Sequence, residues 1–260
     1  MKAFANGIHI NYEVSGEGET ITFVHALGID LDSWWQEVEA LEGAYRVLRF
    51  DVRGHGRSDK PAGPYTIALF ADDLYGLLQA LGVGRTHLVG LSMGGMIGQA
   101  FALAHPEMLH SLVLSDTSSG YTAEEAQVFE QRAALAEREG MEPIVLPTLE
   151  RWFTAPFRAS SPAVVERIAR AIRANDPRAY AASCRAVGAM SLTERLSEIR
   201  CPTMVVVGEQ DLGTTPEMAR AIARRIPGAR LELIPQAAHL VPVEKAAVFN
   251  ALLRDFLARV

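Results

Sequence analysis

Short apolar runs recur along this chain, separated by longer stretches with a helical pattern. The run Met204–Val207 is apolar at every position rather than at every second one. Strands look like this when both faces of the sheet are covered, as in a mostly parallel sheet. The alternation of such strands with helices predicts an α/β fold with a mostly parallel, doubly wound sheet. The predicted strands are Ile8–Val14, Thr20–His25, Arg46–Asp51, Thr86–Val89, Leu112–Ser115, Thr203–Val207 and Arg230–Ile234.

Helices are predicted between these strands, and one long segment contains helices alone. From 118 to 197 no strand pattern occurs, and five prolines punctuate the helical stretches. Proline favours the first turn of a helix and breaks its interior, so this segment should form several short helices. We interpret residues 118–197 as an all-helical lid inserted into a core of residues 1–117 and 198–260. A second small domain with its own core is the alternative. The predicted core helices are Ser33–Leu41, Ile67–Leu81, Met93–His105, Pro216–Arg225 and Val243–Ala258, and those of the lid include Ala123–Arg138, Pro162–Arg173 and Arg178–Val187.

Composition limits the classes of partner. The chain has 260 residues, 49% of them hydrophobic, which is ordinary for a globular protein with a large core. Its net charge is −6 and no basic stripe occurs, which argues against nucleic acid. The first ten residues lack the apolar stretch of a secretory signal and no segment is long and apolar enough for a membrane span, so we expect a cytoplasmic protein. Cys184 and Cys201 indicate neither a disulfide framework nor a metal motif.

The strongest local motif is Gly90-Leu91-Ser92-Met93-Gly94. It follows a predicted strand and opens a predicted helix, which is the setting of a G-x-S-x-G nucleophile elbow. A serine on such a sharp turn projects its hydroxyl from the end of the sheet, and the two glycines leave room for neighbouring backbone. The alternative is a glycine-rich turn without chemistry. The context favours Ser92 as a nucleophile.

A serine nucleophile needs a base, and His239 is the best candidate. It lies in the loop after the last predicted strand, at the same edge of the sheet as Ser92. His25 and His55 also fall on loops at that edge and are weaker rivals. The chain order Ser, acid, His of this kind of site favours His239.

The acid that would orient this base must lie between Ser92 and His239 in sequence. Asp211 follows the strand Thr203–Val207 and meets that condition. It would fix the imidazole tautomer and stabilise the imidazolium. Glu209 and Asp116 are rivals, since both also lie at strand ends.

An oxyanion hole requires two N–H donors. The helix-initial N–H of Met93 is one, and the N–H of Leu27, in the loop after an early strand, is the other. The Gly-rich loop 51–59 lacks the spacing of a phosphate loop, so we interpret it as a structural loop held by internal ion pairs. Trp152, inside the lid, is the aromatic residue expected to line a pocket.

Together these residues resemble the α/β-hydrolase superfamily over nearly the whole chain. Within it the sequence looks most like 3-oxoadipate enol-lactonases of aromatic catabolism. The segments that carry the resemblance are His25–Gly28, Leu48–Ser58, Gly63–Thr66, Gly90–Gly95, Arg151–Thr154, Asp211–Pro216 and His239. The resemblance implies hydrolysis of a small enol-lactone bearing a carboxylate, with Trp152 lining the site. We also expect His25, at the start of the first loop and next to the site, to bind substrate, although many enol-lactonases carry a small or amide side chain there. A carboxylate substrate calls for a nearby cation, for which Arg151, Arg158 and Arg185 in the lid are candidates.

The expected function is therefore cleavage of a small-molecule carboxylic ester or lactone through Ser92, His239 and Asp211, with no metal or organic cofactor. Serine at position 92 excludes the relatives that use an aspartate nucleophile. General carboxylesterases, carbon–carbon bond hydrolases and perhydrolases keep the same triad and stay open, as does a ligand-binding receptor on this fold. We expect neither nucleic acid nor membrane as a partner. A homodimer is compatible with the sequence.

Overall fold

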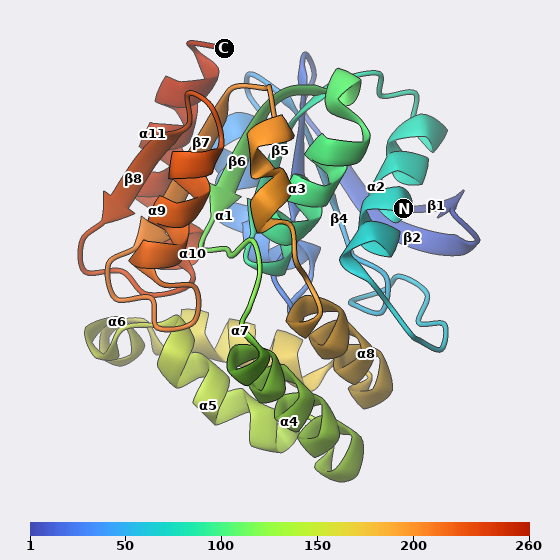
Figure 1. Cartoon of the computed structure of the whole chain (residues 1–260), viewed down its shortest axis with the longest axis vertical. Helices are drawn as coiled ribbons and strands as arrows, with labels where there is room; N and C mark the ends of the chain where they lie inside the picture. The colour runs from blue at the N-terminus through green and yellow to red at the C-terminus, as the bar shows by residue number, and fades with distance from the viewer.

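The computed structural model describes residues 1–260 and contains one eight-stranded sheet (Figure 1). Its strands are β1 (Lys2–Ala5), β2 (Ile8–Ser15), β3 (Thr20–Val24), β4 (Arg46–Phe50), β5 (Thr86–Leu91), β6 (Leu109–Ser115), β7 (Thr203–Gly208) and β8 (Arg230–Ile234). The spatial order is β1-β2-β4-β3-β5-β6-β7-β8. The β1–β2 and β2–β4 pairs are antiparallel, and every pair from β4 to β8 is parallel. The predicted doubly wound, mostly parallel sheet is confirmed.

The burial of the strands explains why their sequences lack alternation. Strands β3, β5 and β7 are buried at every position, because helices cover both faces of the sheet. Strand β1 was not predicted, since it has only four residues and only one of them is buried. It forms because it pairs with β2 as an edge strand, with Ala3 opposite Ile10.

The predicted core helices are observed, but two of them are not continuous α-helices. The predicted helix 33–41 begins as a 3₁₀ turn, and the predicted helix 243–258 is two helices separated at Lys245, whose backbone leaves the helical region (φ −129°, ψ 40°). The helices are α1 (Trp35–Leu41), α2 (Ile67–Ala80), α3 (Met93–Ala104), α4 (Ala123–Glu139), α5 (Glu142–Trp152), α6 (Ala155–Ser160), α7 (Pro162–Arg173), α8 (Pro177–Gly188), α9 (Pro216–Arg225), α10 (Val241–Glu244) and α11 (Ala246–Leu257), with 3₁₀ turns at Leu31–Trp34, Pro106–Met108 and Thr193–Glu198.

Two layers of helices enclose the sheet and a third lies beyond one end of it. Helices α2, α3 and α9 lie on one face, and α1 and α11 lie on the other (Figure 1). Helices α4 to α8, here called the cap helices, connect β6 to β7 and lie below the carboxyl ends of the strands in Figure 1. Within this group α4 packs on α8 and α5 packs on α7. No helix is both long and apolar enough to cross a membrane.

Candidate active site

Ser92 occupies a strained position between β5 and α3. Its backbone has φ 54° and ψ −113°, a combination that residues other than glycine seldom adopt. Two flanking glycines make this possible. A Cβ on Gly90 would lie 2.2 Å from the Gly94 carbonyl oxygen, and one on Gly94 would lie 2.0 Å from that of Val24. The turn is therefore so tightly packed, on itself at position 90 and against β3 at position 94, that only glycine fits at these two positions.

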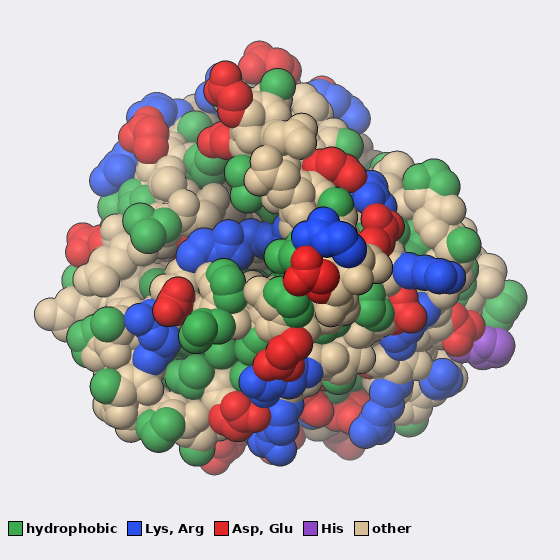
Figure 2. All heavy atoms as spheres, turned by 90° about the horizontal axis from the view of Figure 1, so that it is seen from below, with side chains coloured by type: hydrophobic (Ala, Val, Ile, Leu, Met, Phe, Trp, Pro, Cys, Tyr) green, Lys and Arg blue, Asp and Glu red, His purple; other side chains and the backbone are tan.

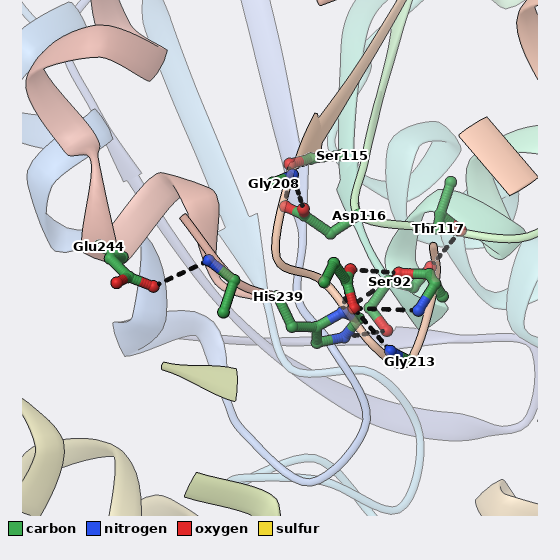
Figure 3. Close-up of polar contacts among 11 residues, drawn as sticks. Ser92, Ser115, Asp116, Thr117, Gly208, Gly213, His239 and Glu244 are labelled. Carbon is green, nitrogen blue, oxygen red and sulfur yellow. Dashed lines mark hydrogen bonds and ion pairs between the residues drawn. The ribbon is translucent and has the colours of Figure 1, made fainter. Parts of the chain in front are cut away.

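Three side chains from separate loops form one hydrogen-bonded chain (Figure 3). The Nε2 atom of His239 lies 2.9 Å from Ser92 Oγ, and its Nδ1 atom lies 2.7 Å from Asp211 Oδ2. Since Nδ1 faces a carboxylate, it carries the proton, which leaves Nε2 to accept the hydroxyl proton of Ser92. His239 and Asp211 are 5% and 2% exposed, so water does not compete for these contacts. The structure thus brings together the three residues predicted as nucleophile, base and acid.

Thr214, which sequence reasoning missed, completes the surroundings of Asp211. Its hydroxyl donates to Asp211 Oδ2 at 2.7 Å, while the N–H groups of Gly213 and Thr214 donate to Oδ1 at 2.8 and 3.0 Å. Burial opposes the charge of Asp211, but the neighbouring His239 and these donors outweigh it, so the pKa of Asp211 lies below its usual range. Asp211 is therefore held as a carboxylate that faces the imidazole.

Asp116 and Glu209, the two alternative acids, do not contact His239. Asp116 accepts hydrogen bonds from Gly208 N–H at 3.0 Å and from the Ser115 hydroxyl at 2.7 Å, and it does not contact His239. Its complete burial, together with the charge of Asp211, raises its pKa well above the usual value. Glu209 points to solvent. Neither rival orients the imidazole in this structure.

The rival histidines are buried behind the site rather than in it. His55 lies against His25, with ring centroids 5.2 Å apart, and its Nδ1 lies 3.1 Å from the Arg53 carbonyl oxygen. Burial and the neighbouring His25 lower the pKa of His55 to about 3. It is a neutral core residue without access to Ser92.

His25 requires a correction, because we expected it to bind substrate. It is 0% exposed and does not line the pocket next to Ser92. Its Nε2 accepts from Val52 N–H at 2.9 Å, and its Nδ1 donates to the Ala26 carbonyl at 2.8 Å. Both ring nitrogens are thus used to hold the loop that carries Leu27. Leu27 and Met93, whose N–H groups are the predicted oxyanion donors, both line the pocket.

The loop 51–59 is also held differently from the expectation. The Asp51 carboxylate accepts from the N–H groups of Leu31 and Arg57 and from the Asn11 amide. The ion pairs of this loop reach outside it: Arg53 forms two short hydrogen bonds to Asp73 of α2, and Asp59 lies within ion-pair distance of Lys2 and His9. Contacts to backbone donors and to other segments, rather than internal ion pairs, therefore hold this loop.

A pocket of about 70 Å³ lies between Ser92 and the cap helices. Trp152 lies in its wall as expected, with its ring centroid 5.8 Å from that of His239. The cap helices also place two guanidinium groups in the pocket, from Arg132 and Arg151, and neither forms an ion pair. Burial and the neighbouring Arg132 lower the pKa of Arg151 to about 10, so Arg151 remains cationic at neutral pH. The lining residues are Leu27, Ser92, Met93, Tyr121, Phe129, Arg132, Arg151, Trp152, Val187, Gly213, Thr214 and His239.

Most other arginines of the cap helices have partners, and the two that do not, Arg170 and Arg178, are exposed to solvent. Basic and acidic side chains alternate over the outer face of this layer (Figure 2). Arg185 pairs with Glu130 and Glu137, and Arg173 pairs with Glu142 and Glu166. Arg158 donates to the carbonyls of Glu150 and Phe153. Of the three cations suggested by the sequence, only Arg151 faces the pocket, and Arg132 was missed because nothing in a helical pattern marks which arginine faces inward.

Comparison with known proteins agrees with this fold. A family model described as "alpha/beta hydrolase fold" matches residues 19–140. The chain is 31% identical to 3-oxoadipate enol-lactonase 2 of Acinetobacter baylyi, over 98% of this chain and 95% of that protein. The chain therefore belongs to the α/β-hydrolase family, and it is a hydrolase.

Two solved structures are similar to it over nearly their whole length. The enol-lactonase of Burkholderia xenovorans superposes with a TM-score of 0.96 at 35% identity, covering 99% of this chain and 100% of that one. A thermophilic esterase of Thermogutta terrifontis, solved with malate bound, gives a TM-score of 0.94 at 32% identity, covering 100% and 98%. Within the family the chain is thus similar to enol-lactonases and to an esterase.

Proposed function

We propose that this protein hydrolyses a small lactone or ester that itself carries a carboxylate, with 3-oxoadipate enol-lactone as the specific candidate. The observation that carries the proposal is the pocket next to Ser92. It joins a serine–histidine–aspartate hydrogen-bonded chain to two guanidinium groups that lack anionic partners. Buried or half-buried cations are normally paired, so an anionic group on the substrate is the natural partner.

The reaction follows from the roles of the three side chains. His239 takes the proton of Ser92 as the serine oxygen attacks the carbonyl carbon, and Asp211 stabilises the imidazolium that forms. The N–H groups of Leu27 and Met93 hold the oxyanion, and each donor contributes roughly 10²–10³-fold in rate. His239 then protonates the leaving oxygen, which in a lactone stays attached to the acyl group. Water activated by the same histidine releases the acid.

The cap helices act in this proposal as a lid that selects the substrate. Arg132 and Arg151 hold the carboxylate, while Tyr121, Phe129 and Trp152 exclude water from the reacting carbonyl. The similarity to the two enol-lactonases and to an esterase solved with malate, a dicarboxylate, supports an anionic substrate. The second candidate is a carboxylesterase for neutral esters, which the apolar part of the same wall favours.

A pair of matched lactones tests the proposal. One is 3-oxoadipate enol-lactone, and the other is α-angelica lactone, which has a methyl group where the first has a carboxymethyl group. We expect kcat/KM for the first to exceed that for the second by about 10²-fold or more, since each hydrogen-bonded ion pair contributes about 1.5–3 kcal/mol. Equal values, or a preference for p-nitrophenyl acetate over both, would exclude the carboxylate-specific function and leave the neutral esterase.

A further inference from the structure

Glu244, at the end of α10, joins the loop of His239 to the cap helices. Its side chain is buried, and its Oε2 accepts a hydrogen bond from the Ala238 N–H at 3.1 Å, as Figure 3 shows. Its Oε1 accepts from the N–H of Thr154 at 3.2 Å and from the Thr154 hydroxyl. Thr154 is the N-cap residue of α6 and lies two residues after Trp152. One carboxylate therefore connects two segments that lie 90 residues apart in sequence.

The residue on the other side of His239 is bound to the same cap segment. The N–H of Leu240 donates to the carbonyl oxygen of Trp152 at 3.2 Å. Ala238 is held through Glu244 and Leu240 is held directly, so both chain neighbours of His239 are fixed to residues 152–154. The indole ring of Trp152 lies beside the imidazole as a consequence.

We propose that Glu244 is a positioning residue that keeps the base His239 and the pocket wall Trp152 at a fixed separation. The proposal rests on the proposed function, because it assigns Glu244 a part in the same hydrolysis. Glu244 touches neither the substrate nor the reacting atoms. It acts by holding the His239 loop and the segment Trp152–Thr154 as one unit.

The chemistry of the contact explains why a carboxylate is needed here. Three donors, two N–H groups and one hydroxyl, converge on the two oxygens of Glu244, and no cation neutralises it. A glutamine has one oxygen and one NH₂ group, so its nitrogen would face an N–H donor and leave that donor unpaired. An unpaired buried donor is costly, and the two segments would separate until water could enter.

Such a separation would act on turnover rather than on affinity. The substrate is held by the pocket, whereas proton transfer depends on the 2.9 Å contact between His239 and Ser92. A shift of about 1 Å in a catalytic group can lower the rate by roughly 10²-fold. A lowered kcat with a nearly constant KM is therefore the signature of this positioning role.

The test compares Glu244→Gln with Glu150→Gln in the full-length protein. Glu150 lies on α5, in the same cap layer, but its side chain is exposed and unbonded. We expect Glu244→Gln to lower kcat about 10- to 100-fold on both the lactone and p-nitrophenyl acetate, with KM within about threefold. Glu150→Gln should match the wild type. A kcat for Glu244→Gln within twofold of the wild-type value would overturn the proposal.

Thr154 provides a second variant pair that does not alter the carboxylate. Thr154→Val removes the hydroxyl donor, and Thr154→Ser keeps it. We expect the valine variant to lose about three- to tenfold in kcat and the serine variant to retain it, since valine removes the hydrogen bond to Glu244 together with the N-cap bond that Thr154 accepts from the Phe157 N–H. This pair decides the question if Glu244→Gln does not fold. Equal kcat values for the two Thr154 variants would overturn the proposal.

Labelling of Ser92 by a fluorophosphonate separates this inference from the proposed function. The label needs His239 as base but no particular substrate. If the wild type hydrolyses none of the substrates, the proposed function fails, and the labelling rate still tests Glu244. Labelling slowed by Glu244→Gln and not by Glu150→Gln supports the positioning role. An unchanged labelling rate overturns it.

Discussion

The carboxyl edge of the sheet and the cap helices meet at one pocket, but they contribute to it by different means. At the carboxyl edge of the sheet, the backbone geometry positions the nucleophile. Ser92 lies at φ 54° on a turn where Gly90 and Gly94 leave no room for a Cβ. The cap helices contribute side chains instead, and Arg132, Arg151 and Trp152 project from regular helices.

The difference shows where such a fold can vary. A change in the backbone at the sheet edge would displace the nucleophile, so the chemistry is tied to the fold itself. A side chain on a helix can be replaced without moving the helix, so the pocket can be adapted to another substrate while the reaction stays the same. Variants of each region should therefore separate loss of chemistry from loss of selectivity.

The largest expected effect comes from Ser92→Ala at the sheet edge. Without the serine oxygen no acyl-enzyme can form, and loss of a triad nucleophile lowers kcat by roughly 10⁶-fold. We expect hydrolysis of every substrate to fall to the background rate while the circular dichroism spectrum is unchanged. Retained turnover by this variant would place the chemistry outside the sheet edge.

Asp211→Asn should have the next largest effect. The amide cannot stabilise the imidazolium and favours the wrong tautomer of His239, which lowers kcat by about 10⁴-fold in such triads. Steady-state kinetics on p-nitrophenyl acetate measure this loss. Asp116→Asn is the matched control, because Asp116 is a buried acid at the neighbouring strand end that makes no contact with His239. A greater loss in the Asp116 variant would reverse our assignment of the acid.

Arg132→Gln and Arg151→Gln test the contribution of the cap helices. Each should lower kcat/KM for the carboxylated lactone by about 10- to 100-fold, because each removes a charged hydrogen-bond donor. Turnover of α-angelica lactone should change little. Arg173→Gln serves as the control, since Arg173 is paired with Glu142 and Glu166 on the outer face. Equal losses on both lactones would mean that the arginines support the fold rather than selectivity.

The smallest effect concerns stability rather than turnover. Complete burial and the nearby Asp211 raise the pKa of Asp116, whereas an unfolded aspartate has a pKa of about 3.9. Between these two values the native state binds more protons than the unfolded state, so stability falls as the pH rises. Asp116→Asn removes this loss, because the amide resembles the protonated acid and the Ser115 hydroxyl can turn to accept from it.

Urea unfolding at pH 5 and pH 7 checks this expectation. The gain in unfolding free energy of the Asn variant over the wild type should be larger at pH 7 than at pH 5. A gain that is the same at both values would show that Asp116 is ionised in the folded protein.

The sequence predicted most of the sheet because the central strands β3, β5 and β7 are buried at every position and are largely apolar. It missed β1, whose exposed residues owe their conformation to pairing with β2. It also missed Thr214 and Glu244, because each contacts a residue far away in the sequence: His239 is 25 residues from Thr214, and Thr154 is 90 residues from Glu244. The expectation for His25 was wrong because position on a loop does not reveal whether a side chain turns toward the pocket or into the core.

The sequence by itself determined the fold class, the strand-to-helix turn at Ser92 and the chain order of Ser92, Asp211 and His239, since these depend on local pattern and backbone sterics. Only the tertiary structure decided which acid faces the imidazole and which two arginines enter the pocket. It also decided that Glu244 joins the cap helices to the loop of His239. Those outcomes depend on distances between segments far apart in the chain, and such distances are fixed only when the helices pack on the end of the sheet.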